Sequence, residues 1–483
     1  MSAAGHPGAT ATDLDGEVGV CVDPRRRFEV SCDFLVIGGG ACGLVAALAA
    51  RDGGAEVIVL EGDAAPGGST ALSSGFIPAA GTHFQKNAGF TDSAHQLEAD
   101  ILAKSAGLAD PVLAHAVAGA SAATIEWLTE RHQLPFMLLT DLHYPGHSVP
   151  RMHCLPEKTG QALAQHLAQA CERAGITVLP SARAVELITD GRGRVLGASC
   201  RRPDGQQEDV GCKALMLACG GFGGHPARVE QHLPEIAQAL FFGHRGNRGD
   251  ALTWGRALGG FAQDLTGYQG HGSVAVPHGI LITWALMMEG GIQINAAGER
   301  FANEHRGYSE HAVEVLRQPG GMAWVVYDQR IHTLGLTFPD YCDAASAGAV
   351  RQADSLAALA EVTGTPPEAL AATLTEVTRL QGGQGLDRHG RAFTGQAALQ
   401  APWYAIRVTG ALFHTQGGLA VDHCARVLRP DGTAFANLYA GGGAARGVSG
   451  PAASGYLSGN GLLSAVNLGR LAGEHAAARL SAA

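Results

Sequence analysis

The stretch CDFLVIGGGACGLVAALAARDG, residues 32–53, places an apolar run, a glycine-rich turn and a helical pattern in direct succession. The run CDFLVI is typical of a buried strand, and LVAALAARDG is typical of a helix. Between them, Gly38, Gly40 and Gly43 complete the pattern G-x-G-x-x-G. These glycines permit a tight turn and let backbone N–H groups at the start of the helix approach a pyrophosphate. The stretch therefore predicts the first strand, turn and helix of an α/β unit that binds phosphate groups.

A second apolar run, EVIVL at 56–60, is followed by Glu61. An acid at the end of the second strand can accept hydrogen bonds from ribose hydroxyls. Because strand, turn, helix, second strand and acid occur in this order, they indicate dinucleotide binding more strongly than the glycine pattern alone. A tight turn without a ligand is the less favoured alternative. We therefore predict a Rossmann-like domain.

Length, charge and cysteine content exclude several other classes of protein. A chain of 483 residues, 46% of them hydrophobic, is expected to form more than one packed unit. The net charge of -10 argues against nucleic-acid binding, and no apolar run is long enough to span a membrane. The ten cysteines include no C-x-x-C pair, which favours a reducing, cytoplasmic location without disulfides. The histidines of PGHSVPRMH, residues 145–153, lack the spacing of a metal site, so no metal is predicted.

A second glycine-rich loop follows the acid, in DAAPGGSTALSSGFIPAAGT, residues 63–82. This order resembles the large FAD-dependent family that contains fumarate reductase and the 3-ketosteroid dehydrogenases. Three further segments fit the same family: ARAVELITDGRGRVLGASC at 182–200, ALMLACGGFGG at 214–224, and NLYAGGGAARGVSG at 437–450 with the helical run GNGLLSAVNLGRLAGEHAA at 459–477. The resemblance implies FAD as cofactor. It is expected to be bound non-covalently, because Ser69 lies about where a succinate dehydrogenase has its flavin-linking histidine.

The cofactor-binding residues that the motif and the resemblance imply lie in five segments. They are Gly38, Gly40, Gly43, Glu61, Gly67, Gly68, Ser69, Thr70, Gly75, Gly220, Gly442, Gly459, Asn460 and Leu462.

The resemblance also implies the domain order. The expected fold is α/β, a Rossmann-like FAD-binding domain built from two chain segments with an inserted α+β capping domain. We expect a flexible N-terminal tail over 1–30, the first FAD-binding segment over 31–267 and the capping, catalytic domain over 268–414. The second FAD-binding segment is expected over 415–483. Helical runs at 352–381 are expected at the periphery of the capping domain.

Two segments of the expected capping domain resemble substrate-binding segments of fumarate reductases. In YQGHGSVAVPHGILITWALMM, residues 268–288, Gln269, His271 and Thr283 match, whereas Trp284 and Met287 replace the glutamate and arginine of the proton relay. The stretch GERFANEHRGYSEH, residues 298–311, keeps the signature G-x-R-F-x-N-E. Beyond this signature a fumarate reductase has an arginine that acts as the acid, whereas this chain has Tyr308 at that position. The 3-ketosteroid Δ1-dehydrogenases also have a tyrosine there, which acts as general base.

Two segments nearer the C-terminus complete the expected site. ALFHTQGGL at 411–419 resembles the signature whose histidine, here His414, holds a substrate carboxylate. In GYLSGNG at 455–461, Tyr456 replaces the arginine that clamps a carboxylate in fumarate reductases. Gly455 matches the carbonyl-binding glycine of the steroid enzymes, and Tyr456 is a candidate for the missing hydroxyl that polarises the ketone.

These replacements favour ketone desaturation over fumarate reduction. A dicarboxylate needs guanidinium groups that bind it bidentately, and tyrosine is a poor substitute. Tyrosine can serve as acid or base toward a carbon acid if neighbouring cations, here His305 and Arg306, lower its pKa. The resemblance then implies that Tyr308 takes the α-proton of a ketone while the β-hydrogen leaves as hydride to flavin N5.

We expect a small cyclic keto acid of the 4-oxocyclohexanecarboxylate type as substrate, and an external electron acceptor such as oxygen or a quinone. The alternatives are a 3-ketosteroid dehydrogenase, a fumarate-reductase-like ene-reductase acting on an unsaturated carboxylate, and a flavin-binding protein without catalysis. Catalytic roles are expected for Tyr308, Tyr456, His414 and His271, and substrate contacts for Gln269, Thr283, Trp284 and Gly455.

Overall fold

A computed structural model of the protein describes residues 18–140, 144–393 and 395–482. Its largest sheet is built around β2 (Val30–Ile37), which pairs in parallel with β10 (Gln207–Leu217) and β3 (Val57–Leu60). β7 (Thr177–Leu179) extends this parallel set beyond β3, and β21 (Ala434–Ala440) pairs with the last residues of β10. Their nearly continuous apolar sequences suit strands that are covered on both faces. The predicted α/β fold is confirmed.

The N-terminal half of β10 joins the parallel part of the sheet to an antiparallel part. It pairs antiparallel with β9 (Val195–Arg201), which forms a hairpin with β8 (Arg183–Thr189). β1 (Gly19–Val22) then pairs in parallel with β8. The expectation of a flexible tail over 1–30 is therefore wrong for these four residues, because backbone pairing with β8 orders them. Residues 1–17 lie outside the described ranges.

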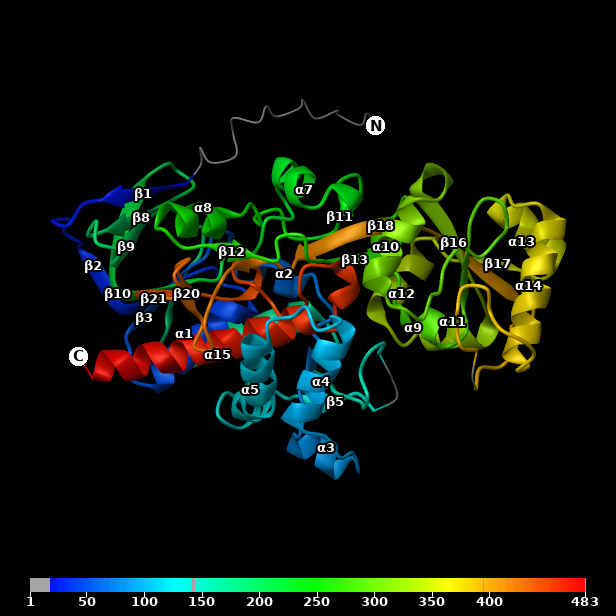
Figure 1. Cartoon of the computed structure of the whole chain (residues 1–483), viewed down its shortest axis with the longest axis horizontal. Helices are drawn as coiled ribbons and strands as arrows, with labels where there is room; N and C mark the ends of the chain where they lie inside the picture. The colour runs from blue at the N-terminus through cyan, green and yellow to red at the C-terminus, as the bar shows by residue number, and fades with distance from the viewer. Residues whose placement is uncertain (1–17, 141–143, 394, 483) are drawn as a thin grey trace.

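The helix α15 (Asn460–Ser481) docks the C-terminal segment onto the first helix, α1 (Ala41–Asp52), and Figure 1 shows α15 as a long helix along the sheet. Two glycines permit this contact. A Cβ at Gly469 would lie 2.4 Å from the carbonyl oxygen of Cys42, and one at Gly473 would lie 2.3 Å from that of Ala46. The FAD-binding domain is thus built from two distant chain segments, as expected.

A second sheet is centred on β18 (Trp403–Thr415), flanked by β13 (Tyr268–Ala275) and β16 (Met322–Asp328). It has its own hydrophobic core, contributed by residues between Ala275 and Val408. Figure 1 shows β18 running from this second unit back toward the first. The second core supports an inserted unit, and its borders at 268 and 414 remain a prediction.

The remaining elements surround these two sheets. On the second sheet and its core lie β11 (Leu240–Phe241), β14 (Ile280–Leu281), α9 (Ala285–Met288), β15 (Ile292–Ile294), α10 (Tyr308–Leu316), α11 (Gln329–Gly335), α12 (Pro339–Ser346), β17 (Arg351–Ala353), α13 (Leu356–Thr363) and α14 (Pro367–Gln381). The last two are the helices expected within 352–381.

The other elements belong to the first unit. They are α2 (Gly68–Ala71), β4 (Ile77–Pro78), α3 (His83–Asn87), α4 (Ala94–Lys104), α5 (Pro111–Glu130), β5 (Met137–Leu138), β6 (Met152–Cys154), α6 (Gly160–Arg173), α7 (Pro226–His232), α8 (Asp250–Ala257), β12 (Ala262–Gln263), β19 (Gly418–Leu419) and β20 (Arg426–Leu428). Within the described ranges, none of the helices has the length and apolar character needed to cross a membrane.

Gly473→Ala is expected to lower the midpoint of urea denaturation, because the added methyl group meets the backbone of α1 at 2.3 Å. Overpacking of this kind costs about 1–3 kcal/mol. Gly119→Ala in α5 is the matched control, since its Cβ would meet nothing within 4 Å. It should stabilise the protein by up to about 1 kcal/mol through helix propensity. Equal midpoints for the two variants would contradict a tight α1–α15 contact.

Candidate active site

One cavity of about 750 Å³ connects the glycine-rich turns of the first sheet with the second sheet. Gly38 and Glu61 lie at its first end, and His271 and Tyr308 line its other end. The volume lies within the range of cofactor and small-molecule sites. The cavity therefore contains a dinucleotide end and a substrate end.

The turn after β2 is built so tightly that only glycine fits at two of its positions. Gly38 has a φ of +111°, and a Cβ there would lie 2.4 Å from the carbonyl oxygen of Ala218. A Cβ at Gly43 would lie 1.9 Å from the carbonyl oxygen of Gly38. Gly38 and Gly40 line the cavity, whereas Gly43 is outside the described lining and serves the packing of α1 against the turn.

Glu61 lies at the end of β3 with its carboxylate at the cavity wall. One carboxylate oxygen accepts a hydrogen bond from the backbone N–H of Gly39 at 2.7 Å, and the other from that of Asp63 at 2.8 Å. Burial raises the pKa of Glu61, and these two donors oppose that effect. The carboxylate is thus held where ribose hydroxyls would meet it.

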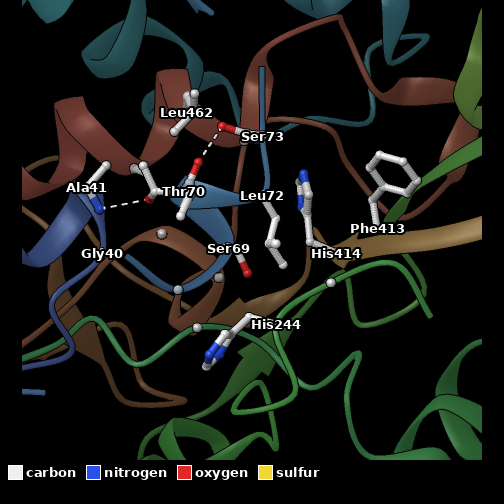
Figure 2. A pocket seen from close by; sticks show the side chains of 18 of the residues that line it. Gly40, Ala41, Ser69, Thr70, Leu72, Ser73, His244, Phe413, His414 and Leu462 are labelled. Carbon is white, nitrogen blue, oxygen red and sulfur yellow. Dashed lines mark hydrogen bonds between the residues drawn. The ribbon is translucent and has the colours of Figure 1, made fainter. Parts of the chain in front are cut away.

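The second glycine loop lies beside the first (Figure 2). Thr70 Oγ1 accepts a hydrogen bond from the N–H of Ala41 at 2.9 Å, and Ser69 Oγ accepts one from Asn247 Nδ2 at 2.8 Å. Gly68 and Gly75 also line the cavity, and Gly67 lies just outside the described lining. The sequence patterns had not identified Asn247, because it belongs to no glycine motif.

The start of α15 forms a further part of the wall. Its N-cap, Gly459, has a φ of +83°, and a Cβ there would lie 2.6 Å from Pro78. Leu462 and Ser464 line the cavity, and the Ser464 hydroxyl is buried without a hydrogen-bond partner in the described structure. Asn460, expected to bind the cofactor, points instead toward Ser449 Oγ at 3.3 Å and is outside the described lining.

These features fit FAD. Backbone N–H groups at the starts of α1 and α15 suit negative charge, and Glu61 suits ribose hydroxyls. Gly220 and Gly442, both predicted cofactor contacts, line the same cavity with positive φ angles. No covalent attachment is indicated, since the side chain at position 69 is a serine.

The substrate end contains a stack of aromatic rings. His271 lies between Tyr308, at 4.8 Å and 24°, and Phe413, at 5.2 Å and 21°. Trp284 meets His271 edge-on at 5.7 Å, and Tyr456 meets Tyr308 edge-on at 6.0 Å. The structure therefore brings together four predicted site residues, and Phe413, which no motif identified, completes the stack.

The Tyr308 hydroxyl lies at the N-terminal end of α10 and faces the turn before α15. Burial raises its pKa to about 12, and the neighbouring polar groups of Ser458, Tyr456 and Gly459 oppose this rise. Burial raises the pKa of Tyr456 as well, and the neighbouring Tyr308 adds to this rise. Each phenol therefore affects the ionisation of the other.

The cations expected to lower the pKa of Tyr308 do not do so, which corrects the sequence-based expectation. The Arg306 residue is exposed, and its carbonyl oxygen accepts from Lys104 Nζ at 3.0 Å. His305 Nε2 lies 3.2 Å from the carbonyl oxygen of Met287, and burial lowers the pKa of His305 to about 4. Neither side chain is among the groups that shift the Tyr308 pKa.

The two imidazoles at the substrate end are neutral. His271 Nδ1 accepts from the N–H of Ser273 at 3.2 Å, and burial lowers the His271 pKa to about 3. His414 Nδ1 is 2.9 Å from Gln416 Nε2, and burial lowers the His414 pKa to about 4. With Nδ1 accepting from Ser273, the His271 ring carries its proton on Nε2. His414 Nδ1 also lies 3.4 Å from the carbonyl oxygen of Thr415, so the His414 tautomer depends on which of its two neighbours Nδ1 bonds.

Guanidinium groups are scarce in this cavity. Among the described lining residues, the basic side chains are those of Arg183 and Lys158. Arg183 lies against Gly62, beside the ribose-binding acid, and Lys158 lies just before α6. Gln269 and Thr283 supply further uncharged polar groups at the substrate end. The described wall contributed by the second sheet thus contains neutral donors rather than a carboxylate clamp.

Gly455 packs against the segment that contains Ser449. A Cβ there would lie 2.0 Å from the carbonyl oxygen of Ser449, and Gly455 is outside the described cavity lining. In the described structure this glycine permits close packing of two backbone segments, and its contact with a ketone oxygen stays a prediction.

The G-x-R-F-x-N-E segment stabilises the loop that precedes Tyr308. Arg300 donates to Glu304 at 2.7 Å and to Asp387 at 2.7 Å, and Arg391 lies 3.1 Å from Glu304. The Trp284 indole N–H donates to the carbonyl oxygen of Glu304 at 3.0 Å. These buried, paired charges fix the loop. The described residues include no cluster of side chains suited to a metal ion.

Comparisons with known sequences match most of the chain. The profile of a family described as FAD binding domain covers residues 33–462. A fumarate reductase (cytochrome) of Shewanella frigidimarina is 30% identical over 452 residues, covering 92% of this chain and 77% of the relative. A 4-oxocyclohexanecarboxylate 2-dehydrogenase of Sinomonas cyclohexanicum is 26% identical over 528 residues, covering 87% of this chain and 88% of the relative.

Solved structures show the same architecture. The open conformation of a flavocytochrome c3 fumarate reductase has a TM-score of 0.78 at 26% identity and covers 94% of this chain and 79% of that one. A 3-ketosteroid-Δ4-(5α)-dehydrogenase of Rhodococcus jostii RHA1 has a TM-score of 0.76 at 24% identity and covers 95% of this chain and 99% of that one. At this identity the likeness shows a shared fold and nothing more. The chain belongs to the FAD binding domain family and is an FAD-dependent oxidoreductase that acts on CH–CH bonds.

Proposed function

We propose that the protein is a desaturase that introduces an α,β double bond next to a ketone in a small cyclic keto acid. The observation that carries this proposal is the position of Tyr308, which lines the substrate end of the cavity and stacks on the neutral His271 ring at 4.8 Å. A general base must be ionised, and the polar groups of Ser458, Tyr456 and Gly459 oppose the rise in the Tyr308 pKa that burial causes. A fumarate reductase of the expected pattern would instead present guanidinium groups here.

In this proposal the chain's own residues bind the ketone and move one proton. The Nε2–H groups of His271 and His414 donate to substrate oxygens, which polarises the ketone and acidifies its α-carbon. Tyr308, as phenolate, takes the α-proton. Bound FAD supplies the acceptor for the hydride that leaves the β-carbon, so that the carbon–carbon double bond forms.

Tyr456 receives a different role from the one expected. Its ring meets the Tyr308 ring edge-on at 6.0 Å, and its oxygen accepts from the N–H of Gly461 at 3.4 Å. A phenol beside Tyr308 can donate its single hydrogen to a Tyr308 phenolate. We therefore assign Tyr456 to the stabilisation of the Tyr308 phenolate and assign ketone polarisation to the imidazoles.

The proposed substrate is of the 4-oxocyclohexanecarboxylate type. Aromatic walls from Trp284 and Phe413 suit a carbon ring, and the Sinomonas relative carries that activity in its name. A single carboxylate would meet neutral N–H donors rather than a bidentate clamp. An external acceptor, such as oxygen or a quinone, would then receive the electrons.

Ene-reduction of an unsaturated carboxylate is the second candidate, because the fumarate reductase of Shewanella frigidimarina is a relative. In that direction Tyr308 would be the acid rather than the base. The protonation state that each direction requires separates the two candidates.

Tyr308→Phe is expected to lower dehydrogenase turnover by about 10²- to 10⁴-fold, because it removes the only atom that takes the α-proton. The visible absorbance of bound FAD should stay unchanged. Tyr404→Phe is the matched control, since its hydroxyl donates to Gln329 within the second unit, outside the described cavity lining. Near-normal turnover of Tyr308→Phe would remove Tyr308 from the mechanism.

Dehydrogenation should accelerate with pH. Below the Tyr308 pKa of about 12, the phenolate fraction rises as protons are removed. The initial rate with an artificial acceptor should therefore rise by up to about tenfold per pH unit through the neutral and mildly alkaline range. Reduction of an enone needs the protonated phenol and should show no such rise. A rate of dehydrogenation that does not change with pH would contradict a phenolate base.

Anaerobic mixing tests the substrate class. A 4-oxocyclohexanecarboxylate should bleach the flavin, whereas succinate should leave it oxidised, because the described cavity lining contributes neutral donors at the substrate end. The methyl ester of the keto acid and a steroid 3-ketone serve as comparisons for the carboxylate and for ring size. Bleaching by succinate and not by the ketones would contradict the desaturase proposal and favour fumarate-reductase chemistry.

A further inference from the structure

His414, near the end of β18, belongs to a row of polar side chains. Its Nδ1 lies 2.9 Å from Gln416 Nε2, and Gln416 Oε1 accepts a hydrogen bond from Ser449 Oγ at 2.7 Å. Ser449 Oγ in turn accepts one from Asn460 Nδ2 at 3.3 Å. Gln416, Ser449 and Asn460 are all buried. The row therefore connects the first turn of α15 with a ring at the substrate end of the cavity.

The donors and acceptors along this row run in one direction. The amide nitrogen of Asn460 can only donate, so the Ser449 oxygen accepts, and the single hydrogen of Ser449 goes to Gln416 Oε1. That bond fixes the orientation of the Gln416 amide, whose NH₂ group then faces His414 Nδ1. Because Nδ1 can bond an NH₂ group only as an acceptor, the ring proton lies on Nε2.

The carbonyl oxygen of Thr415 is the competing partner of His414 Nδ1. A bond to it would need the proton on Nδ1. Its distance of 3.4 Å exceeds the usual range of an N–H···O bond, whereas the 2.9 Å contact with Gln416 lies within the hydrogen-bond range. A proton on Nδ1 would also point at the Gln416 NH₂ group, so that two donors would meet. The buried row therefore favours the Nε2–H tautomer.

The Nε2 side of the His414 ring is open because residue 461 is a glycine. A Cβ at Gly461 would lie 2.8 Å from His414 Nε2, and both residues line the cavity. Burial lowers the pKa of His414 to about 4, so the ring stays neutral. In the Nε2–H tautomer, His414 thus presents one N–H donor on the side that Gly461 leaves free of a side chain.

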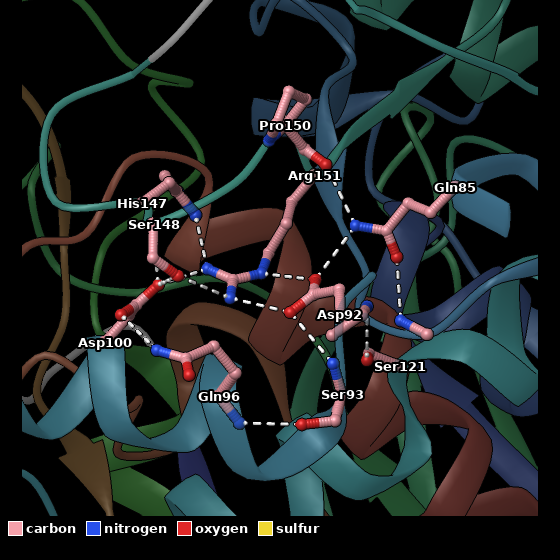
Figure 3. A network of polar contacts seen from close by, with 12 residues as sticks. Gln85, Asp92, Ser93, Gln96, Asp100, Ser121, His147, Ser148, Pro150 and Arg151 are labelled. Carbon is pink, nitrogen blue, oxygen red and sulfur yellow. Dashed lines mark hydrogen bonds and ion pairs between the residues drawn. The ribbon is translucent and has the colours of Figure 1, made fainter. Parts of the chain in front are cut away.

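The far end of the row is held in place by the turn before α15. His147 Nε2 lies 2.9 Å from the carbonyl oxygen of Ser458 in that turn, and His147 Nδ1 lies 3.4 Å from an Arg151 guanidinium nitrogen. Arg151 donates to both carboxylate oxygens of Asp92, at 2.7 and 2.9 Å, and both side chains are fully buried (Figure 3). A bidentate pair of this kind has strong geometric specificity. Asn460, two residues after Ser458, therefore starts the row from a fixed position.

We propose that Gln416 is a positioning residue that keeps the proton of His414 on Nε2, with Ser449 and Asn460 fixing the Gln416 amide. Both polar atoms of that amide are bonded within the protein, so Gln416 acts through His414 although it also lines the cavity. The role rests on the proposed function, in which His414 donates to a substrate oxygen. It adds the residue that makes this ring a donor at Nε2 and not an acceptor.

The tautomer of His414 is read from ¹⁵N spectra of the full-length, FAD-loaded protein labelled at its histidines, because protonated and unprotonated ring nitrogens resonate far apart. The His414 signals are identified by their loss in His414→Asn. The wild type should carry the proton on Nε2. Gln416→Met, which is similar in size and has no donor, should lower the ratio of the Nε2–H form to the Nδ1–H form about twofold to tenfold, the effect of losing one neutral hydrogen bond.

Ser449→Ala should lower the ratio as well, because the Gln416 amide loses the donor that orients it. Gln85→Met is the matched control. Gln85 is also fully buried, and its amide nitrogen donates to Asp92 and to the carbonyl oxygen of Pro150, outside the described cavity lining (Figure 3). This control should leave the tautomer ratio of His414 unchanged.

A proton on His414 Nδ1 in the wild type would overturn the proposal, even if Gln416→Met did not fold. An unchanged ratio in folded Gln416→Met would overturn it too, and Ser449→Ala decides in the same way if Gln416→Met does not fold.

These spectra need no substrate, which separates this proposal from the proposed function. With a 4-oxocyclohexanecarboxylate, Gln416→Met should lower kcat/KM in proportion to the lost fraction of the Nε2–H form, and Gln85→Met should not. If Tyr308→Phe keeps normal turnover, the assignment of Tyr308 as base fails. The tautomer measurement would still decide whether Gln416 controls the proton of His414.

Discussion

The rest of the structure depends on the close backbone contact between α1 and α15. Gly469 and Gly473 let the two helices approach so closely that a single methyl group would collide with a carbonyl oxygen of α1. This contact joins the end of the chain to the first βα unit. It also places the N-terminal turn of α15 at the cavity, where it faces the cofactor and Tyr308 together.

Burial and hydrogen bonding oppose each other throughout the substrate end. Burial holds both imidazoles neutral and makes the tyrosines weaker acids, because a low-dielectric site penalises every charged form. The polar groups of Ser458, Tyr456 and Gly459 oppose this effect at Tyr308 without reversing it. The N-terminal dipole of α15 acts in the same direction, because it favours negative charge near Gly459. A site of this kind suits proton abstraction from a ketone better than tight binding of a dianion.

Local sequence patterns predicted the cofactor end well and the substrate end in part. The glycines at 38 and 43 were identified because steric exclusion of a Cβ is a property of the local turn. His271, Tyr308, His414 and Tyr456 were placed in one cavity by resemblance, and the structure brings them together. Gly455 and Asn460 lie outside the described cavity lining, and neither His305 nor Arg306 is among the groups that shift the Tyr308 pKa, because motif spacing does not tell which side of a turn faces the cavity.

The amino-acid sequence alone determined the α/β class, the FAD site and the replacement of arginine by tyrosine at two positions, since each depends on neighbouring residues or on residue type. Only the tertiary structure showed that Tyr308 meets Tyr456 edge-on, and that His147 bonds the Ser458 carbonyl oxygen and Arg151. These residues come from segments separated by roughly 150 positions or more along the chain. Hydrogen bonds between such distant segments follow from how the helices and sheets pack, and no local pattern records them.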